Sequence, residues 1–263
     1  MTDQEDDIQA APHLERLRLK TFNTLSGRPR PGDVVKRDAG AVVRNDVIVS
    51  SAEPVILDAH PPDRNLILKH YNWVREETER LAAPLSPEDQ VVQSMPDASP
   101  TKWHRAHVTW FFETMVLIPC LPDYVPLDPH YTFLFNSYYD SIGARHPRPD
   151  RGLLTRPSAD EVTAYRAHVD AGMRRLIADS DHEVWTEVSP MITLGLHHEQ
   201  QHQELILMDI LHAFSRNSLA PTYQAYRAGS ARTASTLRWH DHAGGLIEIG
   251  HAGPQFAFDN EGP

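Results

Sequence analysis

The amino-acid sequence predicts a mainly α-helical protein, a four-helix bundle with a short β-rich segment at its C-terminal end. Three observations predict this fold class. Four long stretches repeat apolar residues every three or four positions, which is typical of amphipathic helices. Prolines end or interrupt these stretches. Near residue 226 the pattern changes to short alternating runs with a glycine pair, which favours β-structure. Four long helices in succession indicate a bundle.

Local signals place the ends of the four helices. Asp63 is suited to cap the start of the first helix, and the second is expected to end before Pro119. Ser158 and Glu161 have the spacing of a capping box at the start of the third. The fourth is expected to break near Pro190. The predicted bounds are residues 63–83, 100–118, 158–179 and 182–214.

Three regions are expected along the chain. Residues 1–60 lack sustained helical periodicity and contain Pro and Gly clusters, so we predict a mobile leader there. Residues 61–225 hold the bundle, and residues 226–263 begin a second, β-rich domain. Within the bundle, residues 120–157 form a long loop rich in Pro, aromatic residues and Arg. A loop of this length in a compact domain is usually functional.

Composition excludes several classes of protein. The 25 basic and 36 acidic residues give a net charge of −11, which disfavours a nucleic-acid binder because such proteins need a basic face. No apolar run is long enough for a transmembrane helix, and the N-terminus does not resemble a secretory signal, so we expect a cytoplasmic protein without a membrane partner. The single cysteine, Cys120, excludes an internal disulfide and a cysteine-built zinc site.

Histidine is the residue type that carries the chemistry, with 16 copies. In the run HHEQQHQE, His198 and His202 are four residues apart and share one face of a helix, together with Gln201. His107 lies in the middle of an apolar stripe on the second helix, where burial requires a partner. These three histidines are therefore predicted to meet as a metal site, with His104 as a weaker candidate on the flank. Histidines at this spacing are also common as surface or hydrogen-bonded core residues. His104 and His197 are expected to support the ligands or to pack, rather than to bind the metal.

Three neutral imidazoles without a carboxylate make an all-nitrogen ligand set with open coordination positions. Open positions favour a catalytic over a structural role. Zinc, iron(II), nickel and copper all accept imidazole, so the ligand type alone does not select the metal.

Three separated runs resemble a known family. They are SPTKWHRAHVTWFFE, FNSYYDSIGARHPRPDRGLLTRP and LGLHHEQQHQELILMDI, in this order along residues 63–223. The runs are similar to the N-terminal half of the ergothioneine-biosynthesis sulfoxide synthases, the EgtB family, and the related ovothiol-forming synthases share the arrangement. The resemblance implies a DinB-like four-helix bundle.

The resemblance also implies a site and a reaction. The family holds a non-heme iron(II) with three histidines, which correspond to His107, His198 and His202, and zinc, nickel or manganese are expected as substitutes. The residue at the Gln201 position contacts the histidine-derived substrate, and Arg145 or Arg148 is expected to meet the carboxylates of the thiol substrate. The implied activity is O₂-dependent C–S bond formation between hercynine and cysteine or γ-glutamylcysteine. The oligomeric state is left open.

The C-terminal run GGLIEIGHAGPQFAFDNEGP resembles the first strands of the formylglycine-generating-enzyme-like domain that follows the bundle in this family. The family usually has Arg at the position of Gly262, and the sequence stops at Pro263. Because the resemblance places the active-site Tyr further along that domain, no catalytic residue is assigned here, and we expect this chain alone to have little activity. Two alternatives stay open: a DinB-like metal-dependent thiol S-transferase, and a non-catalytic metal-binding remnant. In the first, residues 120–157 would close the pocket.

Overall fold

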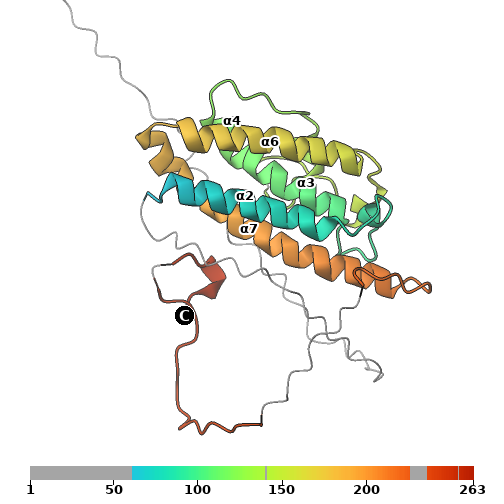
Figure 1. The fold of residues 1–263 in the computed structure, drawn as a ribbon, viewed down its shortest axis with the longest axis vertical. Helices are drawn as coiled ribbons and strands as arrows, with labels where there is room; N and C mark the ends of the chain where they lie inside the picture. Colours follow the sequence, from blue (N-terminus) through green and yellow to red (C-terminus); the bar gives the residue numbers. More distant parts are fainter. Residues whose placement is uncertain (1–60, 140, 226–235, 254) are drawn as a thin grey trace, which may run out of the picture. The chain divides into compact units, whose positions relative to one another are not determined.

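Four long helices form the bundle that the sequence predicts (Figure 1). The computed structural model describes residues 61–139, 141–225, 236–253 and 255–263. Helix α3 packs against α6 and α7, and α2 packs against the same two helices from the other side. The mainly helical fold class is therefore confirmed. The bounds of the long helices are α2 (Arg64–Ala82), α3 (Thr101–Phe112), α6 (Ala159–Asp179) and α7 (His182–Ser215).

Helix caps explain where three of these helices begin. The Asp63 carboxylate accepts hydrogen bonds from two backbone N–H groups at the start of α2. Ser158 and Glu161 form the predicted capping box at the start of α6. Asp181 caps α7 in the same way as Asp63 caps α2. Helix α7 continues through Pro190, so the predicted break is wrong. Pro190 is exposed, and packing along the rest of this long helix outweighs the loss of a single hydrogen bond.

Shorter elements connect the long helices. Helix α3 continues through a π-helical turn into α4, which includes Pro119, so this helix ends two residues later than predicted. In the π-helical turn the Ile118 N–H bonds to the carbonyl of Glu113, and the new turn that follows accepts a proline near its start. The bounds of the short elements are η1 (Asp89–Val91), η2 (Glu113–Leu117), α4 (Ile118–Cys120), α5 (Tyr131–Leu134), η3 (Arg148–Leu153) and η4 (Asp259–Glu261).

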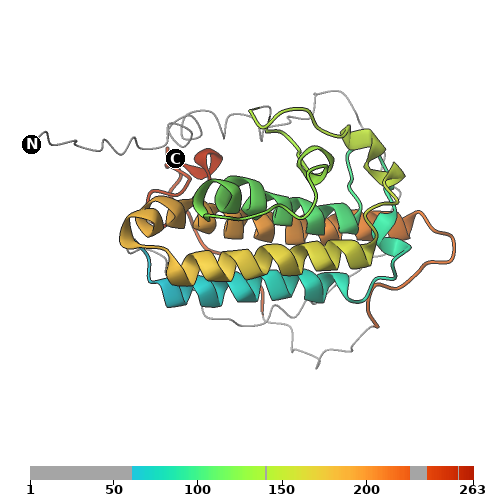
Figure 2. The same cartoon turned by 90° about the horizontal axis from the view of Figure 1, so that it is seen from above.

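The connection between α4 and α6 packs along α3, on the side away from α2 (Figure 2). The indole N–H of Trp103 donates to the backbone carbonyl of Leu134, and Lys102 donates to that of Leu154. In the π-helical turn, the buried carboxylate of Glu113 accepts from the phenols of Tyr124 in the connection and Tyr165 on α6. The connection is thus attached to two helices of the bundle.

Close packing of α7 on α3 depends on a glycine one turn before the histidine motif. A Cβ atom at Gly195 would lie only 2.5 Å from the ring of Phe112. Without that side chain, the buried rings of Phe111 and Phe112 contact the α7 backbone directly. Gly195 therefore allows the two helices that carry the histidines to approach each other.

Charged side chains occupy part of the core. The Glu199 carboxylate, fully buried on α7, forms ion pairs with Arg75 of α2 and Arg166 of α6, at 2.8 and 3.0 Å. Arg75 also pairs with Asp170 at 2.7 Å, and Arg166 pairs with Glu79 at 2.6 Å. Each charge of this network therefore has an opposite charge in contact, which is the condition under which burial of ions is tolerated.

The predicted β-rich segment is not found in the part of it that the structure describes. Residues 236–253 and 255–263 contain no strand, and the short turn η4 is their only regular element. Isolated strands without a sheet to pair with are marginal, which is the physical reason for this difference. The predicted leader, residues 1–60, lies outside the described residues. No helix in the described ranges is long and apolar enough to cross a membrane.

We expect Glu199→Ala to lower the free energy of unfolding by about 3–5 kcal/mol, because the buried guanidinium groups of Arg75 and Arg166 each lose one of their two carboxylate partners. Urea denaturation of the metal-free protein measures this change. Glu204→Ala, an exposed glutamate on the same helix, is the matched control and should stay within about 0.5 kcal/mol of the wild type. Equal effects of the two substitutions would contradict the structural role of the core ion pairs.

Acid should weaken the same network. Burial alone would raise the pKa of Asp170, but Arg75 and Arg166 bring it below its usual value. The stability that this depressed pKa provides is present above the pKa of an unfolded Asp, about 3.9, and is lost as the pH falls through the folded pKa. The difference in unfolding free energy between the wild type and Asp170→Asn should therefore be constant above about pH 5 and shrink below about pH 4. A difference that does not change between pH 7 and pH 3 would contradict this.

Candidate metal centre

The three predicted histidines meet between α3 and α7. His107 comes from α3, and His198 and His202 come from adjacent turns of α7. Their ligand atoms all lie within 4.8 Å of one another, and the ring centroids are 4.6 to 5.0 Å apart. His107 is buried, whereas His198 and His202 are partly exposed. The group therefore has one side in the core and one side accessible to a ligand.

The ring of His107 is fixed on three sides. Its Nδ1–H donates to the backbone carbonyl of Phe135 at 2.6 Å, which leaves Nε2 as the ligand atom. Trp103, one turn earlier on α3, stacks on the ring at 4.6 Å, and Trp110 stacks at 5.5 Å. A histidine buried in an apolar stripe is predicted to need a hydrogen-bond partner, and the Phe135 carbonyl is that partner for His107.

The charge state of the three imidazoles fits metal binding. Burial, together with the neighbouring histidines, lowers the pKa of His107 and of His202 well below its usual value. Burial also lowers the pKa of His198 to about 4. All three rings are neutral near pH 7, and a neutral ring has a lone pair to offer.

His198 provides a second observation that fits a metal ion. Its Nδ1 atom is buried and has no hydrogen-bond partner among the described residues. A buried polar atom without a partner costs free energy, and binding of an ion by this ring would offset part of that cost. The donor set of three neutral imidazoles therefore fits a divalent transition-metal ion, and it does not distinguish iron(II) from zinc, nickel or manganese.

His104 and Asp209 lie directly behind His202. The Nδ1 atoms of His104 and His202 are 2.8 Å apart, and Nε2 of His104 is 3.0 Å from a carboxylate oxygen of Asp209. His104 therefore contacts a metal-binding histidine and is not itself one of the three, His107, His198 and His202, which are called the triad below. Asp209 is a site residue that the sequence reasoning missed. Its position seven residues after His202, on the same face of α7, was the available signal.

The arginines of the long connection lie at different depths. Arg145 is exposed, and Arg148 is partly buried and donates to the Tyr138 phenol and to the backbone carbonyl of Asp97. Arg151, which the sequence reasoning missed, is buried with its guanidinium 3.4 Å above the Trp103 ring. Because η3 has about three residues per turn, Arg148 and Arg151 share one face of it.

Arg151 is a buried cation beside Trp103 that has no carboxylate partner among the described residues. It donates to the hydroxyls of Ser99 and Ser137, and within the described residues it forms no ion pair. Burial, and the positive charges of Arg148 and Arg145, lower its pKa to about 9. Trp103 separates its guanidinium from the His107 ring. This side of the site therefore favours a negatively charged ligand.

Gln201 and His197 lie outside the triad. Gln201 is exposed on α7 and its side chain makes no hydrogen bond within the described ranges. The structure gives it no partner, and its contact with a substrate stays a prediction. His197 is partly buried near His70, and burial lowers the pKa of both rings.

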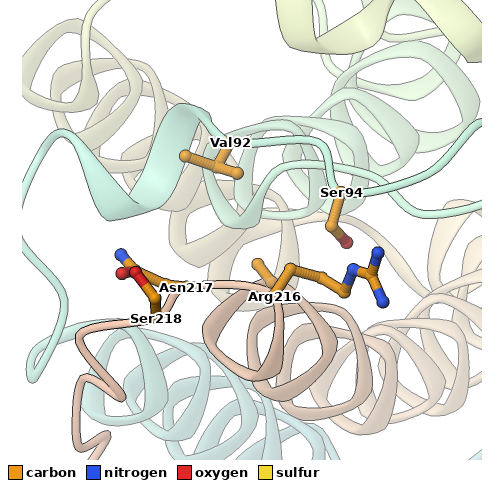
Figure 3. A pocket seen from close by; sticks show the side chains of 6 residues that line it. Val92, Ser94, Arg216, Asn217 and Ser218 are labelled. Atoms are coloured by element: carbon orange, nitrogen blue, oxygen red, sulfur yellow. The ribbon is translucent and has the colours of Figure 1, made fainter.

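A shallow hollow lies elsewhere, at the C-terminal end of α7 (Figure 3). It has a volume of about 470 Å³. None of the three histidines lines it, so it is separate from the metal centre. Its lining residues are Val92, Ser94, Ala213, Arg216, Asn217 and Ser218.

We expect the purified protein to bind a single divalent transition-metal ion, and the double variant His198→Ala/His202→Ala to lose it, because two of the three ligands are gone. Elemental analysis after dialysis measures the bound metal. His168→Ala is the control, since this α6 histidine bonds to the backbone carbonyl of Val125 and should keep the wild-type metal content. Stoichiometric metal in the double variant would contradict the assignment.

Comparison with known proteins agrees with the fold. The DinB superfamily matches the chain over residues 70–206, a range that includes all three histidines of the triad. No curated protein matches the chain. The matched range covers more than half of the sequence and most of the four-helix bundle. The chain belongs to the DinB superfamily, whose helical domains bind metal ions.

Proposed function

We propose that the protein is an iron(II)- and O₂-dependent sulfoxide synthase, which joins hercynine to cysteine or γ-glutamylcysteine. The observation that carries this proposal is the convergence of three separated sequence motifs at one site. The first motif supplies His107, the third supplies His198 and His202, and the arginine-rich second motif packs beside them. The same three motifs, in the same order, carry the resemblance to the EgtB family.

The reaction balances with O₂ as the only oxidant. The C2–H bond of the hercynine imidazole and the S–H bond of the thiol break, and a C–S bond forms. One oxygen atom of O₂ becomes the sulfoxide oxygen, and the other leaves as water with the two hydrogens. Iron(II), when bound by the three histidines, supplies the redox chemistry that O₂ requires.

The protein's own residues contribute binding and orientation in this proposal. The arginines of the second motif provide cations for the carboxylates of the thiol substrate, and the guanidinium of the buried Arg151 lies on Trp103 of α3. Gln201 lies on the exposed side of α7 next to His202, where an amide is available to a second substrate. Holding both substrates beside one ion lowers the entropic cost of their meeting.

A direct assay tests the proposal. Iron(II)-loaded protein is incubated with hercynine, air, and either cysteine or γ-glutamylcysteine, and the sulfoxide is measured by mass spectrometry together with oxygen consumption. We expect slow turnover by this chain, with the sulfoxide formed and the O₂ consumed in equal amounts, and neither in the His198→Ala/His202→Ala variant. Thiol transfer to an acceptor without O₂ would replace this proposal by the S-transferase alternative. Metal binding without turnover of either kind would leave a binding protein.

We expect Arg148→Met to raise the KM for the thiol substrate about tenfold or more, because a hydrogen bond between charged groups is worth about 1.5–3 kcal/mol. The KM for hercynine should change little. Arg174→Met on α6, where the side chain bonds to Asn72, is the control and should leave both constants unchanged. Equal changes in both KM values would argue against selective recognition of the thiol substrate.

A further inference from the structure

Two side chains behind His202 form a chain of hydrogen bonds that ends on a backbone group. One carboxylate oxygen of Asp209 lies 2.8 Å from the backbone N of Ser99 and 3.0 Å from Nε2 of His104. The other ring nitrogen of His104 lies 2.8 Å from Nδ1 of His202. His104 is buried and the Asp209 side chain is 14% exposed, so water has little access to these bonds.

The direction of each hydrogen bond follows from donor chemistry. The backbone N–H of Ser99 can only donate, so the Asp209 oxygen that it meets is an acceptor. Nε2 of His104 faces the same oxygen and must carry the hydrogen. In a neutral His104 the Nδ1 atom is then bare, and Nδ1 of His202 must donate to it. The remaining nitrogen of His202, Nε2, has a free lone pair.

We propose that Asp209 and His104 are positioning residues, which fix the Nδ1-protonated tautomer and the ring orientation of His202 and so hold its Nε2 toward the metal ion. This inference rests on the metal centre of the proposed function. His202 and His107 then both bind the metal through Nε2. The His107 ring is fixed by a backbone carbonyl, and the His202 ring is fixed by two side chains. Partners of this kind typically change metal affinity without touching the metal.

The tautomer can be measured directly in the wild-type protein. Nitrogen-15 NMR of the histidine side chains distinguishes protonated, bare and metal-bound ring nitrogens, and zinc(II) is a diamagnetic probe for the site. The His202 signals are identified by their loss in a His202→Gln variant. We expect a protonated Nδ1 and a zinc-bound Nε2 in His202. Zinc bound through Nδ1 of His202, or a protonated Nε2 in His202, would overturn the inference.

Zinc affinity, measured by competition with a chromophoric chelator, tests the two residues themselves. We expect Asp209→Asn and His104→Phe to weaken zinc binding by about 10–100-fold. The matched controls are Asp128→Asn, whose carboxylate also pairs with a histidine, His130, and His168→Phe. Both controls should keep the wild-type affinity.

The outcomes test the positioning role of Asp209 and His104 separately from the metal centre. Wild-type affinity in both the Asp209 and the His104 variant would overturn the positioning role and leave the metal centre intact. No zinc binding by the wild-type protein would overturn the metal centre and the inference together. Should a variant fail to fold, which circular dichroism reveals, the wild-type NMR spectrum still decides the tautomer.

Discussion

The rotation of helix α7 about its own axis is the constraint on which the metal centre depends. Consecutive helix residues point about 100° apart, so His198 and Glu199 face different neighbours. Glu199 is held by Arg75 of α2 and Arg166 of α6. With that carboxylate fixed between two helices, His198 and His202 face α3 and its His107. A rotation of α7 that moved the histidines away from His107 would also pull Glu199 out of its buried ion pairs, and unpaired buried charges are costly.

The opposite wall of the site depends on the long connection between α4 and α6. Its Phe135 carbonyl fixes the His107 ring, and its Arg151 stacks on Trp103. Glu113, in the π-helical turn, binds this connection through Tyr124 and binds α6 through Tyr165. The irregular turn thereby directs a carboxylate toward two phenols, and π-helical turns frequently occur near functional sites. The connection between α4 and α6 therefore helps to hold the side chains of the metal centre in place.

The sequence was sufficient for the bundle and the triad for one reason: both depend on helical periodicity. His107 was identifiable because it interrupts an apolar stripe, and His198 and His202 because they are four residues apart. The core ion pairs were not predictable, since Arg, Glu and Asp are usually exposed and their pairing partners lie on other helices. Arg151 and Asp209 were missed for the same reason, because their roles depend on contacts across more than 50 residues. Residues 236–253 and 255–263 form no strand, because short runs need neighbouring strands to pair with, and alternation along the sequence says nothing of such neighbours.

The charge of the site follows from its ligands. Three neutral imidazoles leave the two positive charges of a bound divalent ion uncompensated, unlike a set that includes a carboxylate. The buried Arg151, which has no ion-pair partner among the described residues, adds a further positive charge beside Trp103. In a partly buried site such charges attract anions more strongly than they would in water. A thiolate bound to the metal and a carboxylate bound to the guanidinium would satisfy both charges, which supports the thiol amino acid of the proposed function.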